Sequence, residues 1–127
     1  ILSWLFPRAA RWVLERGPRM AVIKQGEHGA LLVSKEMTFK VPAYPLQEVF
    51  DPTGAGDTFA GGFIGYLAAT RDVSFENMKR GIIYGSAMAS FCVEKFGLER
   101  VIDLTQSEIE QRVQEFVDLV QFDIQLV

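Results

Sequence analysis

The chain has 127 residues, of which 49% are hydrophobic and 23% are charged, a balance that fits one ordinary soluble domain. Its net charge of −3 gives no electrostatic reason to expect a nucleic-acid partner. No apolar run approaches the roughly 18 residues of a membrane span and no signal-peptide pattern is present, so we expect no membrane partner either.

The cysteine content points to a reducing compartment. Cys92 is the only cysteine, which excludes an internal disulfide and a cysteine-based zinc cluster. Its apolar neighbours Phe91 and Val93 predict a buried side chain rather than a catalytic thiol. We therefore expect a cytoplasmic protein.

The first part of the chain predicts one helix followed by three strands. Pro7 suits the first turn of a helix, and Gly17-Pro18 suits its end. Short runs of apolar and β-branched residues bounded by turn residues are typical of strands. The segments expected are, in order, a helix over residues 7–16 and strands over residues 19–24, 30–34 and 37–41.

The second part predicts mainly helices. The apolar residues of the run 59–67 recur with helical spacing, so we expect a helix that begins at about Gly56. Ser74 is a suitable N-cap for a second helix over residues 75–95, with Gly97 as its C-terminal stop. Small residues make that helix slim, which favours close helix packing over close approach of a ligand.

The C-terminal segment predicts a strand-like piece and a last helix. Residues 101–104 are expected to form a short edge segment, and Thr105 with Glu108 forms a capping box that opens the final helix. Strands that alternate with helices indicate an α/β layer architecture. Without repeats or a linker, we expect residues 1–127 to form a single domain.

The stretch Asp51-Pro52-Thr53-Gly54-Ala55-Gly56-Asp57-Thr58-Phe59 predicts a phosphoryl-transfer site. Its two glycines allow successive backbone N–H groups to converge on one point, and the start of a helix adds a positive end that binds anions such as phosphate. A carboxylate in that position would repel the anion unless it removes a proton from an attacking hydroxyl. Asp57 is therefore a candidate general base.

Two other interpretations fit this stretch less well. A glycine-rich turn before an acid-capped helix would not need two glycines, a proline and two acids. A dinucleotide-binding domain would need a third glycine at a fixed offset after Gly54 and Gly56, and Asp57 would repel the pyrophosphate.

Extended through Ala60-Gly61-Gly62-Phe63, the stretch resembles the C-terminal signature of the ribokinase-like (PfkB) carbohydrate kinases. The resemblance implies a ribokinase-like three-layer α/β/α fold and transfer of the γ-phosphate of ATP, with Mg²⁺, to a sugar or nucleoside hydroxyl. It implies that Asp57 is the catalytic base. It also implies an anion hole built from the backbone of Gly54, Ala55, Gly56 and Asp57.

The resemblance also implies nucleotide-binding positions. Gly26 and Gly29 match a Gly-x-x-Gly turn that lines the ATP phosphates and ribose in the family. Lys24 is a candidate phosphate contact, or else a solvated charge at a strand end. The helix and loop that enclose adenine correspond loosely to Ser86, Ser90, Phe96 and Gly97, which a packed helix end would need as well.

Asp51 and Thr53 have two interpretations. In many relatives, the matching Asp and the backbone around the Thr hold a monovalent cation such as K⁺ near the anion hole, where it adds positive field. The structural alternative is a side-chain-to-backbone turn made by Asp51.

The resemblance covers only the C-terminal portion of such a kinase. The chain begins Ile1-Leu2-Ser3-Trp4 without Met, and the Asn-x-x-Glu element that organises magnesium in the family is absent from residues 1–50. We expect the N-terminal half, with the sugar-binding part, to be missing. The alternative function is therefore a nucleotide-binding or structural fragment that is inactive alone, and an exposed sheet edge would favour a homodimer.

Overall fold

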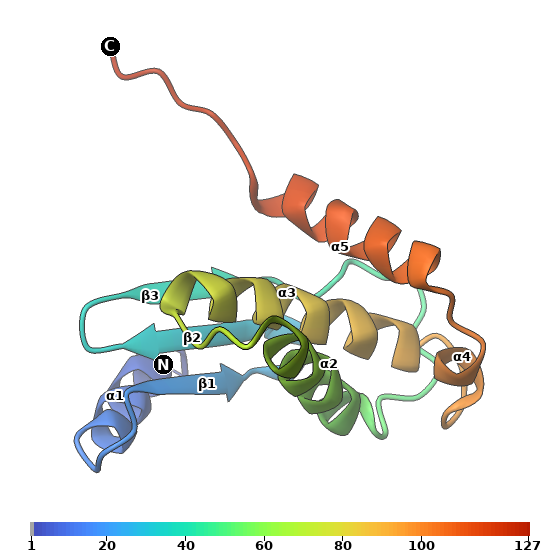
Figure 1. Ribbon diagram of the computed structural model, residues 1–127, viewed down its shortest axis with the longest axis horizontal. Coiled ribbons are helices and arrows are strands. Elements are labelled where there is room, and N and C mark those ends of the chain that lie inside the picture. The colour runs from blue at the N-terminus through green and yellow to red at the C-terminus, as the bar shows by residue number, and fades with distance from the viewer. Residues whose placement is uncertain (1) are drawn as a thin grey trace.

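The chain folds as a three-stranded antiparallel sheet with helices packed against it (Figure 1). The computed structural model describes residues 2–127, with side chains from Phe6 onward. The elements are, in order, α1 (Leu2–Leu14), β1 (Met20–Lys24), the 3₁₀ turn η1 (Gly26–His28), β2 (Ala30–Ser34), β3 (Thr38–Val41), α2 (Ala55–Thr70), α3 (Phe75–Cys92), α4 (Glu99–Ile102) and α5 (Gln106–Val120).

The strand register gives the sheet two buried faces. Val22 of β1 pairs with Leu32 of β2, whereas Ile23 pairs with Leu31 on the opposite face. Leu31 and Leu32 are both buried, because α2 and α3 cover one face and α1 packs beside β1. The result is the layered α/β architecture that the sequence predicts.

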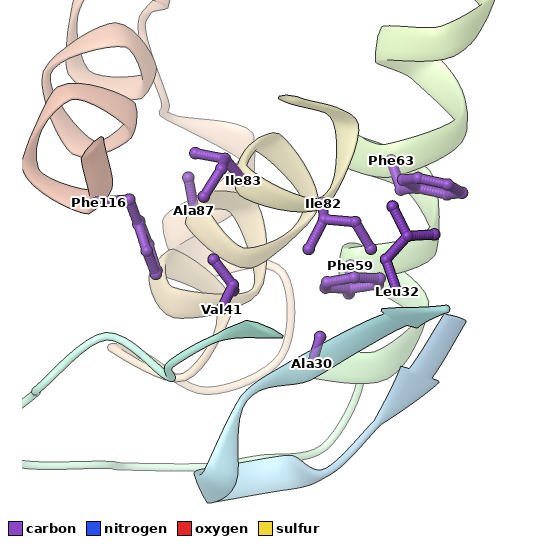
Figure 2. Close-up of a cluster of buried hydrophobic side chains, with 9 residues drawn as sticks. All are labelled: Ala30, Leu32, Val41, Phe59, Phe63, Ile82, Ile83, Ala87 and Phe116. Atoms are coloured by element: carbon purple, nitrogen blue, oxygen red, sulfur yellow. The ribbon is translucent and has the colours of Figure 1, made fainter. Parts of the chain in front are cut away.

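The core forms where the sheet, α2, α3 and α5 meet (Figure 2). Each fully buried large aliphatic or aromatic side chain contributes about 1.5–3 kcal/mol. Phe59 and Phe63 stack one helical turn apart, with ring centroids 6.3 Å from each other, and anchor the first half of α2 against the sheet. The remaining core residues are Ala30, Leu32, Val41, Ile82, Ile83, Ala87 and Phe116.

Glycines let α2 and α3 pack closely, which confirms the helix-packing interpretation. A Cβ on Gly85 would lie 2.8 Å from the carbonyl oxygen of Phe59, and one on Gly62 would lie 3.1 Å from the Cα of Gly85. A Cβ on Gly81 would lie 3.0 Å from the ring of Phe63. These contacts leave no space for a side chain at any of these three glycine positions.

The predicted caps of α3 and α5 are confirmed. The Ser74 side chain accepts a hydrogen bond from the backbone N–H of Asn77 at 3.3 Å. At α5, the Thr105 hydroxyl accepts from the Glu108 N–H and the Glu108 carboxylate accepts from the Thr105 N–H, a complete capping box.

The start of the first helix is predicted wrongly. The helix does not begin at Pro7 but at Leu2, so Pro7 lies inside it, and it ends at Leu14 rather than at residue 16. A proline removes a single i→i−4 bond. The helix tolerates this loss because Ala10 and Leu14 bury its apolar face.

Two predictions near the end of α3 are also wrong. Residues 101–104 do not form a sheet edge, because Glu99–Ile102 is a short helix whose Arg100 is held by ion pairs. A short apolar run cannot distinguish strand from helix by itself. The helix α3 ends at Cys92 and not at residue 95, and Gly97 makes a later turn with φ +56°.

No helix among residues 2–127 is both long and apolar enough to cross a membrane.

Candidate functional site

The loop of residues 50–54 delivers the chain into the N-terminus of α2. Gly54, the N-cap, has φ +82°, a left-handed conformation that costs other residues roughly 1–2 kcal/mol. This conformation turns the Gly54 carbonyl into the helix, where it accepts the Thr58 N–H and the Thr58 hydroxyl, each at 2.9 Å. Gly54 therefore fixes where α2 begins.

The first turn of α2 presents backbone donors without acceptors. Within residues 2–127, no group accepts a hydrogen bond from the N–H of Gly56 or of Asp57. The Ala55 N–H, in contrast, donates to the Pro52 carbonyl at 3.2 Å, within the turn. Two adjacent free N–H groups at the positive end of a 16-residue helix are suited to bind an anion.

Asp57 is an exposed carboxylate in this same turn. In the part of the chain that the structure describes, no side chain or backbone group donates a hydrogen bond to its carboxylate, and no cation lies within 4 Å of it. A carboxylate with unoccupied lone pairs can accept a proton from a bound hydroxyl.

Lys24 adds a positive charge to the turn. It stands at the end of β1, and its Nζ donates to the Gly56 carbonyl at 3.1 Å, 32 positions along the chain. Its ammonium makes no ion pair among the described residues. A Cβ on Gly56 would lie only 2.9 Å from this Nζ, so glycine leaves the room that the lysine occupies.

The Gly26–Gly29 turn directly follows Lys24. Gly26 has φ +57° and nothing within 4 Å of a Cβ, so its backbone is open to solvent. Gly29 has φ +89°, and a Cβ there would lie 2.0 Å from the Val41 carbonyl oxygen, so it also serves close backbone packing. His28 is exposed, as expected for a turn residue.

Asp51 makes the predicted side-chain-to-backbone turn. Its Oδ1 accepts the Thr53 N–H at 2.9 Å, and this backbone hydrogen bond is the main reason that the pKa of Asp51 lies below its usual value. The proposed cation position between Asp51 and Thr53 stays a prediction.

The four positions predicted around adenine are only partly brought together. The Ser90 hydroxyl is buried, donates to the Ala87 carbonyl at 2.6 Å and accepts from Arg112 of α5 at 2.7 Å, so it serves helix packing. Ser86 is half-buried on α3, a turn earlier. Phe96, in contrast, is exposed, and its ring stands edge-on to that of Phe50, with centroids 6.1 Å apart.

Further residues lie beside the site. A surface hollow is lined by Phe50, Glu94, Lys95, Phe96 and Glu99, and Gly97 lies within the same loop. The signal for Phe50 is its place directly before the glycine-rich stretch. No local pattern reveals Cys92, whose Sγ lies beneath the loop, 3.7 Å from the Thr53 carbonyl oxygen.

Comparison with known proteins identifies the family of the chain. The pfkB family carbohydrate kinase pattern matches residues 7–103. The ribokinase of Staphylococcus aureus (strain COL) is 30% identical over 102 residues, which cover 80% of this chain and 32% of that protein.

Solved structures share the fold. Aminoimidazole riboside kinase from Salmonella enterica, complexed with aminoimidazole riboside and an ATP analog, superposes with a TM-score of 0.72 at 28% identity over 84% of this chain and 35% of that chain. A double mutant of fructokinase from Vibrio cholerae O395, in a form with fructose, ADP and potassium ion, superposes with a TM-score of 0.74 at 17% identity. The match covers 84% of this chain and 34% of that chain. The chain thus spans about a third of the length of these proteins.

Proposed function

Since this chain belongs to the pfkB family of carbohydrate kinases, we propose that it supplies the phosphate-binding and catalytic part of an ATP-dependent sugar or nucleoside kinase. The carrying observation is the unpartnered Asp57 carboxylate in the same helical turn as two unpartnered N–H groups, with Lys24 bound to that turn. The names of the relatives support a sugar or nucleoside as acceptor.

The residues of the turn divide the work of phosphoryl transfer. Asp57 accepts the proton of the acceptor hydroxyl while that oxygen forms its bond to the γ-phosphorus and the bond to the bridging oxygen breaks. The N–H groups of Gly56 and Asp57 donate to the oxygens of the transferring phosphoryl group. The Lys24 ammonium adds positive charge beside it.

The metal requirements follow from the donors present. Among residues 2–127, no three His, Cys, Asp or Glu side chains come together. Mg²⁺ in a kinase site needs only one or two carboxylates beside the substrate phosphates. We propose that Mg²⁺ is held mainly by the ATP phosphates and by residues outside this chain. For K⁺, Asp51 and the backbone near Thr53 are the proposed ligands, as the resemblance to the family implies.

Substitution of Asp57 tests the proposal. The whole protein would be assayed with MgATP against a panel of sugars and nucleosides. Asp57→Asn is expected to lower turnover by ~10²–10⁴-fold, the contribution of a positioned proton acceptor. Asp123→Asn, which changes an exposed carboxylate in the C-terminal segment, should leave turnover unchanged. Full turnover in a folded Asp57→Asn variant would refute the assignment.

A second candidate function is nucleotide binding without phosphoryl transfer. It is favoured because the chain covers only about a third of the length of its relatives. Calorimetric binding of MgATP with no phosphoryl transfer to any acceptor would support it. Transfer to one acceptor would exclude it.

We also propose a homodimer, since β1 and β3 each have an edge without a neighbouring strand within residues 2–127. Light scattering that shows a stable monomer would contradict the dimer.

A further inference from the structure

The C-terminal end of α3 holds the loop of residues 50–54 at two points. The Phe50 N–H donates to the Val93 carbonyl at 3.0 Å, and the Cys92 thiol donates to the Thr53 carbonyl at an S···O distance of 3.7 Å. Cys92 is buried, and its Sγ lies 3.8 Å from where a Cβ on Gly54 would be. The end of α3 therefore supports the loop of residues 50–54, which is called the anion-binding loop below.

The next residue, Glu94, connects the end of α3 to the rest of the molecule. One carboxylate oxygen, Oε1, accepts from Arg112 Nη2 at 2.7 Å, and the other, Oε2, accepts from Arg100 Nε at 3.2 Å. The Arg112 guanidinium lies 4.2 Å from the Tyr44 ring centroid and 4.0 Å from that of Phe91, and its side chain is 13% exposed. Arg112 thus has little freedom to move, and it fixes Glu94.

Arg100 extends the connection to the start of α5. Its Nη2 donates to Glu108 Oε1 at 2.7 Å, and Glu108 is the acidic member of the capping box. The Glu94 carboxylate therefore joins the end of α3 to α4 and α5 at once. The backbone at this end makes one long hydrogen bond, from the Val93 N–H to the Ala89 carbonyl at 3.4 Å, and one of ordinary length, from the Glu94 N–H to the Phe91 carbonyl at 3.1 Å.

We propose that Glu94 is a positioning residue for the anion-binding loop. Its two ion pairs hold residues 92–94 in the place from which Cys92 and Val93 support the loop. The effect on catalysis rests on the proposed function, and it is exerted through the loop, without contact between Glu94 and substrate. Glu94→Gln keeps the shape of the side chain and removes one of the two carboxylates that pair with Arg112, the other being Glu115.

Native-state hydrogen exchange of the whole protein tests this link without any assay of activity. In Glu94→Gln, the Phe50 amide is expected to exchange at least about tenfold faster, while the Leu32 amide in the central strand changes by less than about twofold. Glu110→Gln removes an equal charge from the exposed side of α5 and should change neither amide. Arg112→Lys, the second variant, keeps the positive charge but loses the planar guanidinium with its several donors. It should also make the Phe50 amide exchange faster.

Phosphoryl transfer, normalised to the folded fraction, completes the experiment. Glu94→Gln should lower kcat by about tenfold or more, as expected when reacting groups are misplaced. The pair Glu94→Gln with Arg112→Lys should lower kcat by less than the product of the two single effects, since the variants share the Glu94–Arg112 contact. Equal acceleration of Phe50 and Leu32, or Phe50 exchange equal to that of Glu110→Gln, would overturn the inference. An inactive wild-type protein would refute the proposed function instead and leave the exchange result to decide the role of Glu94.

Discussion

At the scale of single residues, glycines in this chain serve different purposes, and the neighbours of the missing Cβ tell them apart. At Gly29 the neighbour is a backbone carbonyl, which cannot move away. At Gly56 it is the Nζ of Lys24, the far end of a flexible side chain. Substitution should therefore damage stability at the first position and function at the second.

Gly29→Ala is expected to lower the free energy of unfolding by about 2 kcal/mol or more, because φ +89° is strained for alanine and its Cβ would meet the Val41 carbonyl. Urea unfolding measures the change. A loss below about 0.5 kcal/mol would show that the turn rearranges freely.

Gly56→Ala is expected to leave stability unchanged or raised by up to about 1 kcal/mol, because alanine favours the helix. Its Cβ displaces Lys24 from the turn, so MgATP affinity should fall about tenfold, ~1.4 kcal/mol. Calorimetry measures the affinity, with Gly61→Ala as the control, since nothing lies within 4 Å of a Cβ there. Equal affinities for the two variants would contradict a role for Lys24.

The helix start beside Gly54 and the place of Asp57 in the first helical turn could be predicted from the sequence because they depend on local backbone conformation. The Lys24–Gly56 contact could not, since it joins residues 32 positions apart through the packing of α2 on the sheet. The partner of Ser90 was missed for the same reason. Its hydroxyl is bound by Arg112, 22 positions away.

At the scale of elements, the crossing of α2 and α3 sets the position of the candidate site, because α2 carries the proposed anion-binding turn at its N-terminus. Phe59 and Phe63 anchor that half of α2, and the bare surface of α3 at Gly81 and Gly85 receives them. The glycines cost helix propensity, about 1 kcal/mol each, in exchange for close packing.

Gly85→Ala should therefore destabilise the chain by about 1–3 kcal/mol despite its better propensity, because a Cβ would lie 2.8 Å from the Phe59 carbonyl oxygen. Gly65→Ala, on α2 with nothing within 4 Å, should stabilise by up to about 1 kcal/mol. Thermal unfolding compares them. A stabilising Gly85→Ala would mean that the two helices are not in close contact.

The capping box of α5 should make stability depend on acid. Hydrogen bonds from the Thr105 backbone and from Arg100 hold the pKa of Glu108 at about 2, below the ordinary 4.5. Because this pKa is depressed in the folded state, the contribution is fully present above about 4.5 and is lost as the pH falls toward about 2. Urea unfolding at about pH 6 and about pH 3 should show a smaller acid loss for Glu108→Gln than for wild type. Equal losses would contradict the assignment.

Helix starts could be predicted where the capping residue and its partner lie close together in the sequence, as at Ser74 and Thr105. Residues 101–104 were mistaken for a sheet edge because their helical turn depends on Arg100 reaching Glu94 and Glu108. Such ion pairs are set by tertiary packing and leave no periodic signal.

At the scale of the whole molecule, residues 2–127 supply a layered core and one loop–helix site, and span about a third of related kinases. The site lies where the end of β1 meets the start of α2. These two segments are 32 positions apart in the chain, and the hydrogen bond from Lys24 to the Gly56 carbonyl joins them. The central claim is that the first turn of α2 binds the transferred phosphate.

A titration of the 127-residue chain with MgATP, followed by amide NMR, tests that claim most directly. We predict the largest shifts at the amides of Gly54, Gly56 and Asp57, with smaller shifts at Lys24 and Gly26. A folded chain whose shifts lie elsewhere, or that shows none at saturating nucleotide, would contradict the account.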